Sequence, residues 1–218
     1  MPAIVNAEMF RTAHAFVSKE ETRYYLQGVY VHKHQLVGIL MVVTDGHRMI
    51  VIHDKDGSTD LDGVIVKLDK DALAKCKADR RELGSRKLRS RKLRIEGDGE
   101  VTVLADGGET PVASYRNCLI DGTFPDYTRV VPRETSGELA TFNGHYLGDF
   151  GKASQELSGL KSGGIRILEN GDSPALIRFM SADHAFGVLM PMRDQDYMGT
   201  PWFYTAAPEP ADMPMAAE

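Results

Sequence analysis

The segment VVTDGHRMIV, residues 42–51, places an acid, an imidazole and a guanidinium inside an apolar run. Asp45, His47 and Arg48 could act as acid–base and anion-binding groups of an enzyme. The same residues could instead form a structural turn or the edge of a binding pocket. No serine or cysteine lies in a nucleophile motif and no glycine-rich phosphate loop is present in the sequence, so catalysis is the weakest of the three interpretations.

His32 and His34, in the segment HKH, are the other pair whose side chains could hold a metal ion. They share one strand face, but no further His, Cys or Asp cluster accompanies them, so the pattern is weak as a metal site. Cys76 and Cys118 are the two cysteines, and neither has metal-ligand or redox-motif spacing. We therefore expect reduced thiols in a cytoplasmic protein and predict no metal and no cofactor.

Residues 67–94 are strongly basic in a chain whose formal net charge is −5. The stretch holds twelve Lys or Arg and four Asp or Glu, whereas the whole chain holds 26 and 31. Such asymmetry is typical of a surface that binds a polyanion, and a solvated, charge-rich helix is the alternative interpretation. No apolar run approaches the roughly 20 residues that cross a bilayer, and the N-terminus lacks a signal-peptide pattern. We expect no membrane contact.

The elements that must position these residues follow one pattern three times: a strand, an amphipathic helix, then several strands. Apolar residues at helical spacing predict helices over 7–17, 69–83 and 144–158, with Asp69 as a cap. Strands are expected at 23–32, 37–44, 48–53, 63–68, 92–96, 100–105, 111–116, 118–120, 138–143, 164–168, 175–181 and 185–190. This order predicts an α+β fold whose repeats cannot each bury an apolar face alone.

The expected third helix carries Gly144, Gly148 and Gly151 on the stripe opposite its apolar face. Glycine weakens a helix by about 1 kcal/mol relative to alanine. Three glycines on one stripe indicate either close approach of another element or a thin, exposed helix face. Residues 194–218 end in a Pro-, Ala- and acid-rich stretch that we expect to be partly flexible, although its Trp202–Tyr204 cluster could dock elsewhere.

Four motifs resemble, in their order along the chain, the bacterial replicative sliding clamp, the beta subunit of DNA polymerase III: ETRYYLQGVY, VVTDGHRM, DGTFPDYTRVVP and VLMPMR. Residues 1–132 are similar to the complete middle domain of that clamp, and residues 137–193 to the second half of its last domain. Residues 194–218 form a C-terminal extension. The resemblance implies a DNA-clamp fold of three helix-plus-antiparallel-strands repeats, with helices lining a ring and sheets outside. It further implies a non-catalytic processivity factor for DNA replication.

The resemblance also implies that double-stranded DNA is held by sequence-independent, salt-sensitive phosphate contacts. Arg23, Tyr24 and Tyr25 match the family's RYYL turn, which reaches toward DNA; an ordinary aromatic strand is the alternative. The other DNA-binding candidates come from the basic stretch and are Lys70, Lys77, Arg81, Arg86, Lys87, Arg89, Arg91, Lys92 and Arg94.

Members of this family have a hydrophobic pocket that binds a short motif of DNA polymerase, the clamp loader and repair proteins. Methionine suits such a surface because it adapts to many partners, and arginines at the rim could hold a peptide carboxylate or carbonyl. Position by position, the resemblance places in this pocket Leu26, Thr44, Gly46, His47, Arg48, Met49, Pro125, Arg129, Val130, Val188, Leu189, Met190, Pro191, Met192 and Arg193.

Rings of this family contain twelve repeats, so three repeats per chain imply four chains. We expect the half domain at 137–193 to be completed by another subunit through isologous contacts, with a homotetramer, a dimer of dimers, closing the ring. A dimer or a trimer stays open, and Trp202–Tyr204 could pack near the pocket or a neighbouring subunit. The nearest alternative function is a clamp-like adaptor that binds clamp-interacting proteins without encircling DNA. The reduced architecture suggests a phage or similar mobile element as its source.

Overall fold

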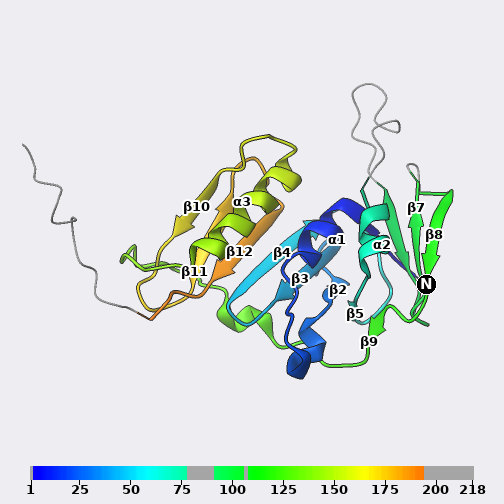
Figure 1. Ribbon diagram of the computed structural model, residues 1–218, viewed down its shortest axis with the longest axis horizontal. Coiled ribbons are helices and arrows are strands. Elements are labelled where there is room, and N and C mark those ends of the chain that lie inside the picture. The colour runs from blue at the N-terminus through cyan, green and yellow to red at the C-terminus, as the bar shows by residue number, and fades with distance from the viewer. Residues whose placement is uncertain (1, 78–90, 106–107, 194–218) are drawn as a thin grey trace, which may run out of the picture.

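The computed structural model describes residues 2–77, 91–105 and 108–193 (Figure 1). The first repeat contains β1 (Ala3–Asn6), α1 (Ala7–His14), the 3₁₀ helix η1 (Glu21–Leu26), β2 (Val29–Lys33), β3 (Ile39–Thr44) and β4 (Arg48–Asp54). The second contains β5 (Val64–Val66), α2 (Lys70–Lys75), β6 (Lys92–Ile95), β7 (Val101–Leu104), β8 (Pro111–Tyr115) and β9 (Leu119–Ile120). The 3₁₀ helix η2 (Tyr127–Val130) then leads to α3 (Gly144–Ser158), β10 (Ile165–Leu168), β11 (Ala175–Phe179) and β12 (Ala185–Leu189).

Each α-helix begins at a polar cap that lies at the same place in its repeat. The side chains of Asn6, Asp69 and Asn143 accept hydrogen bonds from backbone N–H groups in the first turns of α1, α2 and α3. Such caps satisfy donors that a helix start leaves unpaired. The three caps therefore set the point at which the chain turns from its first segment into the helix of each repeat.

The strands form two antiparallel sheets. One sheet has the order β1-β6-β7-β8, and the other has the order β10-β11-β12-β4-β3-β2-β5-β9. The first and second repeats interlock, because β1 lies on β6 of the second repeat while β5 lies on β2 of the first. The third repeat joins the first through β12, which pairs with β4.

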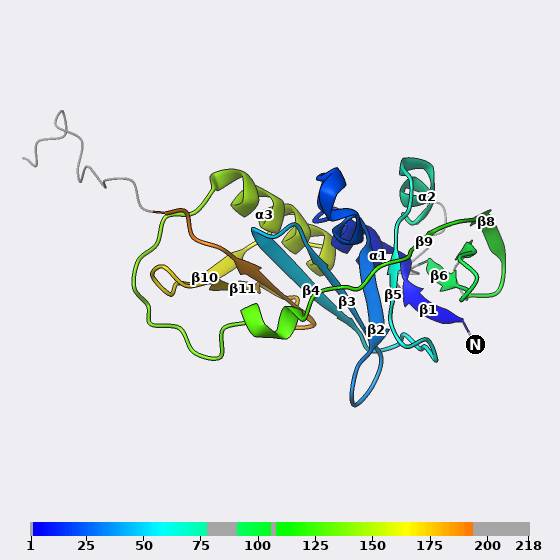
Figure 2. The same cartoon turned by 90° about the horizontal axis from the view of Figure 1, so that it is seen from below.

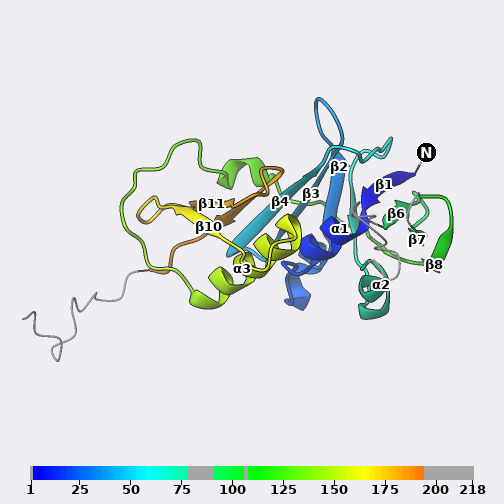
Figure 3. The same cartoon turned by 90° about the horizontal axis from the view of Figure 1, so that it is seen from above.

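The α-helices α1, α2 and α3 lie on one side of the sheets, as Figures 2 and 3 show from opposite directions. Phe10, Phe16 and Phe150 are fully buried between the helices and the strands. The rings of Phe16 and Phe150 lie 5.0 Å apart, so the first and third repeats share one core. Burying side chains of this size contributes about 1.5–3 kcal/mol each. Among the described helices, none has both the length and the apolar character to cross a membrane.

The expected strand 23–32 is confirmed only over its second half, as β2, and the expected strand 138–143 is wrong. Residues 23–26 belong to the 3₁₀ helix η1, because Leu26 alone of these turns inward while Arg23 and Tyr24 are exposed, so strand alternation is absent. Residues 138–143 lie in no sheet, since no neighbouring strand of the described chain runs beside them. The α-helix α1 ends at His14, earlier than residue 17.

Among the described residues, no other element packs against the open side of the glycine stripe of α3. A methyl group added at Gly144, Gly148 or Gly151 would meet nothing within 4 Å. The helix α2 ends at Lys75 with Cys76 as its C-cap, earlier than residue 83, and residues 78–83 lie outside the described part of the chain.

Candidate functional site

An apolar cavity of about 190 Å³ lies where the first and third repeats join. Met49 of β4 and Val188 of β12 face each other across the paired strands and form its buried floor. The N–H of Met190 donates to the carbonyl of His47 at 2.9 Å, which continues the pairing past the end of β12. The cavity is lined by Leu26, Thr44, Gly46, His47, Arg48, Met49, Pro125, Asp126, Tyr127, Val130, Val188 and Met190.

The polar cluster that interrupts the apolar run is a turn between β3 and β4. One oxygen of Asp45 accepts the backbone N–H groups of His47 and Arg48 at 2.9 and 3.0 Å, and the other accepts Nε of Arg48 at 3.0 Å. Gly46 has a φ of +93°, a left-handed conformation that favours glycine. A methyl group there would also lie 2.5 Å from the Arg23 guanidinium. Asp45 is thus occupied in shaping the turn.

Arg48 ties this turn to α3. Its guanidinium, with 8% of the side chain exposed, lies 4.7 Å from the ring centres of both Phe16 and Tyr146. Its Nη1 donates to Oδ2 of Asp149 at 2.6 Å. Partial burial would raise the pKa of the Asp149 carboxyl, but hydrogen bonds from Arg48 and Lys152 outweigh burial and hold that pKa below its ordinary value. Arg48 therefore walls the cavity while its charge is satisfied inside the protein.

The mouth of the cavity is apolar with a charged rim. Val130 is 44% exposed and Met190 is 40% exposed. Asp126 caps η2, and a hydrogen bond from the Thr128 hydroxyl lowers the pKa of its carboxyl. Arg129 pairs with Asp126 at 3.4 Å and points into solvent, so it does not line the cavity. An apolar side chain could enter such a site with polar groups left at its edge.

Four other expected pocket residues lie elsewhere. Leu189 is fully buried beneath the helices, because side chains alternate along β12 and Val188 takes the pocket face. Pro191 and Met192 line a separate cavity beside residues 139–141. Arg193 is exposed and is not among the lining residues.

Asp126 and Tyr127 line the cavity and were missed, although both belong to the motif FPDYTRV. The Tyr127 hydroxyl lies 3.0 Å from Nε2 of His32. Each of these residues faces the cavity because η2 curls the motif over the strands, a turn that spacing along the chain does not reveal.

The basic stretch divides between different surfaces. Lys70 and Lys77 are exposed on and just after α2. Arg91 is buried, and its Nη1 donates to the carbonyl of Lys75 at 2.6 Å near the end of α2. Lys92 and Arg94 alternate along β6 with two buried core residues, so they face away from the helix layer. Arg91, Lys92 and Arg94 were expected to bind DNA, but Arg91 is buried and the other two face away from the helix layer that carries Lys70 and Lys77.

Several expected residues lie outside the described part of the chain. These are Arg81, Arg86, Lys87, Arg89 and the extension 194–218 with Trp202–Tyr204.

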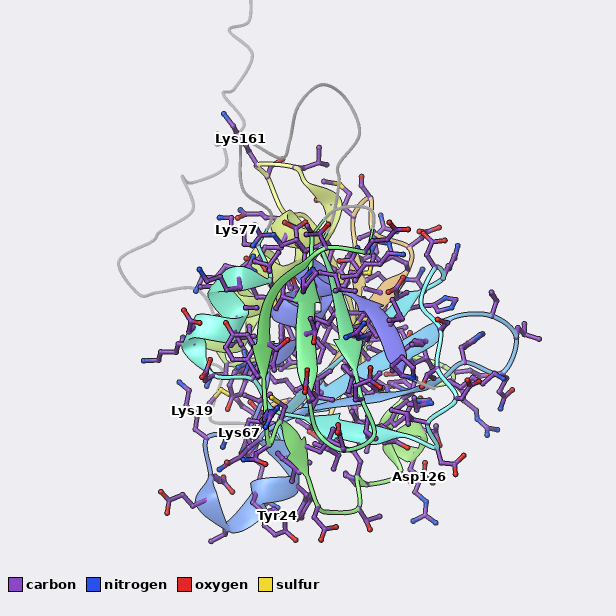
Figure 4. All side chains as sticks on the ribbon, turned by 90° about the vertical axis from the view of Figure 1, so that its right-hand side faces the viewer. Lys19, Tyr24, Lys67, Lys77, Asp126 and Lys161 are labelled. Carbon is purple, nitrogen blue, oxygen red and sulfur yellow. The ribbon has the colours of Figure 1, made fainter. Side chains whose placement is uncertain are left out.

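The side of the sheets on which α1, α2 and α3 lie, called the helix side, carries lysines that were not among the expected DNA-binding residues. Figure 4 shows Lys19, Lys67 and Lys161 on the same side as Lys77 and α2, whereas Asp126 lies toward the opposite side. Lys67 donates to Oε1 of Gln27 at 2.7 Å. Lys19 and Lys161 are isolated in the sequence, so no local signal marks them, whereas Lys67 begins the basic stretch 67–94.

The η1 turn also lies at this side of the molecule, and Figure 4 labels Tyr24 at its end. Tyr24 is 52% exposed, and its ring meets that of Tyr25 edge-on at 5.7 Å. Nε of Arg23 lies 3.1 Å from a carboxylate oxygen of Glu20.

The histidines of HKH have local hydrogen-bond roles. Besides its contact with Tyr127, His32 lies 3.0 Å from the carbonyl of Lys33, and burial lowers the pKa of its imidazole. His34 accepts the N–H of Leu36 at 3.3 Å. Within residues 2–77, 91–105 and 108–193, no three His, Cys, Asp or Glu side chains gather as a metal site. Cys76 and Cys118 are free and buried, and burial raises the pKa of the Cys76 thiol to about 12.

The repeats exchange strands, pair edge to edge, and enclose an apolar cavity where the first and third repeats meet. This arrangement defines a protein with the DNA-clamp fold. The DNA polymerase III subunit beta of Borrelia burgdorferi matches this structure with a TM-score of 0.63 and 16% identity, covering 88% of this chain and 64% of that one. A sliding clamp of Pseudomonas aeruginosa matches with a TM-score of 0.62 and 18% identity, covering 88% and 66%.

The sequence points in the same direction. The beta sliding clamps of two Caulobacter vibrioides strains, NA1000 / CB15N and ATCC 19089, are each 30% identical over 197 residues, or 85% of this chain. These residues cover 47% of each relative, so the chain spans about half the length of the curated relatives it matches. No protein-family model matches the chain. The chain is a homologue of bacterial beta sliding clamps and has their fold.

Proposed function

We propose that this protein is a DNA sliding clamp, a non-catalytic processivity factor that encircles duplex DNA and tethers other proteins. The observation that carries the proposal is the open apolar cavity between β4 and β12, in a chain that has the sliding-clamp fold. Asp45 is engaged in a turn and Arg48 in ion pairs, so the polar cluster serves the cavity wall and not catalysis.

The ligand of the cavity is a short hydrophobic motif carried by DNA polymerase, the clamp loader and other replication or repair proteins. An apolar side chain of the motif would cover Met49 and Val188, which form the floor, while Met190 adapts to its shape. Covering about 100 Å² of apolar surface contributes on the order of 2.5 kcal/mol. The rim residues Asp126 and Arg129 would contact polar groups of the peptide.

The helix side faces the DNA. Its exposed lysines, including Lys67, Lys70 and Lys77, would contact phosphates without reading sequence. Contacts of this kind permit sliding and weaken as salt rises. We place this function in the cytoplasm, together with the DNA and the replication proteins.

The interlocked repeats support a division into domains. We infer that residues 1–132 form one complete clamp domain, because β1 and β5 are exchanged between its two repeats. Residues 137–193 would form a half domain completed by another subunit. Two chains then present three domains in a row, and two such pairs close a homotetrameric ring, a dimer of dimers.

Retention on DNA of different topology tests the proposal. The protein is placed on a nicked circular DNA by a bacterial clamp loader with ATP, and half of the sample is then cut once by a restriction enzyme. Gel filtration is expected to show retention on the circle and loss from the cut DNA, because a ring slides off free ends. Equal retention on both DNAs, with hydrophobic peptides still bound, would identify the clamp-like adaptor instead.

A further inference from the structure

Among the described residues, the eight-stranded sheet ends at β10, and no other strand covers its outer backbone edge (Figure 1). The N–H of Met180 donates to the carbonyl of Gly164 at 2.9 Å, just before β10 begins. Because backbone groups alternate in direction along an antiparallel strand, Ile165 and Ile167 direct theirs away from β11. Within the described chain, no backbone group pairs with Ile165 or Ile167 on that side. An open edge of this kind can accept another strand.

In the other two repeats, the equivalent edge is covered by a strand from a different repeat. The strand β1, which precedes α1, lies on β6, with Val5 opposite Leu93. The strand β5, which precedes α2, lies on β2, with Val66 opposite Val29. In both cases the covered strand is the first one after the helix of its repeat. The edge of β10 has the same position in the third repeat.

The segment 138–143 is the counterpart of β1 and β5. It ends in ATFN before α3, as β1 reads AIVN before α1, and Asn143 caps its helix as Asn6 does. Yet 138–143 belongs to no sheet, and Leu139 within it is 88% exposed. The segment therefore resembles β1 in sequence, but among the described residues it pairs with no strand.

The position of α3 prevents this segment from covering β10 of its own chain. The Ser154 hydroxyl donates to the carbonyl of Gly164 at 2.8 Å, so the later part of α3 lies beside the start of β10. Since 15 helical residues span about 22 Å, Asn143 lies toward the other end of that strand.

In the described part of the chain, the backbone reaches this edge only at the far end, where the N–H of Gly137 donates to the carbonyl of Glu169 at 3.0 Å. Continuing antiparallel from there would carry residues 139–143 toward Ile165, away from the start of α3. The segment instead leaves the edge, and the carbonyl of Thr141 accepts the N–H of Met192 at 2.7 Å.

We propose that the segment 138–143 of one copy pairs with the β10 edge of a second copy, which returns its own segment in exchange. Two third repeats would thereby interlock as the first and second repeats do within one chain. The contact is isologous, so both junctions form together. The inference rests on the proposed function in one respect, because it specifies how the half domain of the clamp is completed.

Proline substitutions test the exchange by removing single N–H groups. The N–H of Ala7 donates to the carbonyl of Arg91, so alternate residues back to Ala3 direct their backbone toward β6. When ATFN is aligned with AIVN, Ala140 corresponds to Ala3 and Thr141 to the next residue of β1. Ala140 would therefore direct its N–H to the partner's edge, whereas Thr141 would direct its N–H away from it. The segment variant is therefore Ala140→Pro, and Thr141→Pro is its matched control. The edge variant is Ile167→Pro, with Ile167→Val as control.

Sedimentation velocity of the full chain across micromolar concentrations measures the association. We expect Ala140→Pro and Ile167→Pro each to raise the Kd of self-association at least tenfold. Both control variants should keep a Kd near that of the wild type. Mixing the two proline variants is expected to restore association in part. One junction of the mixed pair is intact, because the Ile167→Pro copy supplies a normal segment and the Ala140→Pro copy a normal edge.

Hydrogen exchange separates lost pairing from lost folding. The amides of Ile165 and Ile167 should be protected in the associated wild type and exchange quickly in Ala140→Pro, while amides of β11 stay protected. A monomeric wild type, equal weakening by Ala140→Pro and Thr141→Pro, or no restoration on mixing would overturn the exchange.

The two proposals fail separately. Unchanged assembly of Ala140→Pro, with topology-dependent DNA retention, would remove strand exchange and leave the clamp function standing. Normal strand exchange without peptide binding or DNA retention would remove the clamp function instead.

Discussion

The apolar cavity depends on a few buried, mutually contacting residues, whereas the helix side depends on many exposed and separate lysines. The cavity depends on a few buried groups, with Met49 and Val188 as its floor and Arg48 held by two carboxylates behind its wall. The helix side presents exposed lysines such as Lys67 and Lys77 that come from separate elements. Each part of the cavity therefore depends on its neighbours, whereas each lysine contributes nearly alone.

This difference predicts different responses to mutation. Buried contacts concentrate free energy in a few residues, as anchors do in protein interfaces. Phosphate contacts spread a long-range, salt-dependent attraction over many charges. Single substitutions should thus have large effects at the cavity and small, additive effects at the helix side.

Replacing Arg48 should have the largest effect. The Arg48→Ala variant leaves the carboxylates of Asp45 and Asp149 without their buried partner, which costs about 3–5 kcal/mol of unfolding free energy. Urea denaturation followed by circular dichroism measures this loss. Arg129→Ala is the matched control, because Arg129 is 83% exposed and should change stability by less than about 1 kcal/mol. Similar losses for the two variants would show that the buried network does not hold the cavity wall.

Placing a charge in the mouth of the cavity should weaken peptide binding without unfolding the protein. Met190 is 40% exposed and lines the cavity, so Met190→Asp should raise the Kd of a fluorescent hydrophobic clamp-binding peptide at least about tenfold, or 1.4 kcal/mol. Leu36→Asp, at an 89% exposed position outside the cavity, should bind the peptide normally. Fluorescence anisotropy measures both. Unchanged binding by Met190→Asp would move the peptide site elsewhere.

A partly buried histidine on α1, His14, should make the interior beneath the helix side sensitive to acid. Burial lowers the pKa of His14 to about 4 from its ordinary 6.5. The unfolded chain therefore binds a proton at His14 more readily than the folded chain does. The contribution of neutral His14 to the free energy of unfolding is complete above pH 6.5 and is lost as the pH falls toward 4. A shift of this size corresponds to about 3 kcal/mol. Urea titrations of wild type and His14→Gln at pH 7 and 4.5 should show a smaller acid loss in the variant.

Removing single lysines from the helix side should have the smallest effects. Lys67→Ala or Lys77→Ala should each lower the slope of log affinity against log salt by about 0.9, if one phosphate contact is lost. Lys55→Ala is the control, because Lys55 lines a surface cavity with Val51 and Phe186 on the other face of the sheet. Binding to duplex DNA across a salt series measures the slope. A single lysine that abolished binding would contradict a distributed surface.

The cavity was predictable to a large extent because its residues lie in compact motifs. TDGHRM contributes Thr44, Gly46, His47, Arg48 and Met49, and all of them line it. The errors arose where a motif continues through a strand, since alternate residues must face opposite sides. Val188 reaches the cavity, whereas Leu189 enters the core.

The helix side was less predictable because charge density along the chain does not specify a face. Lys92 and Arg94 belong to the most basic stretch, yet β6 turns them away from the helices. Lys19 and Lys161 are isolated in the sequence, yet the fold brings them to the side of α2.

The sequence by itself determined the features that depend on neighbouring residues. The apolar spacing of 144–158 predicted the bounds of α3, and the type of Asp69 predicted its role as a cap. These features follow from hydrogen bonds and packing within a few residues. The tertiary structure decided which repeats exchange strands, that Arg48 is buried between Phe16 and Tyr146, and that 138–143 lacks an edge within its own chain. Such outcomes depend on the positions of distant strands and helices, and local spacing does not encode those positions.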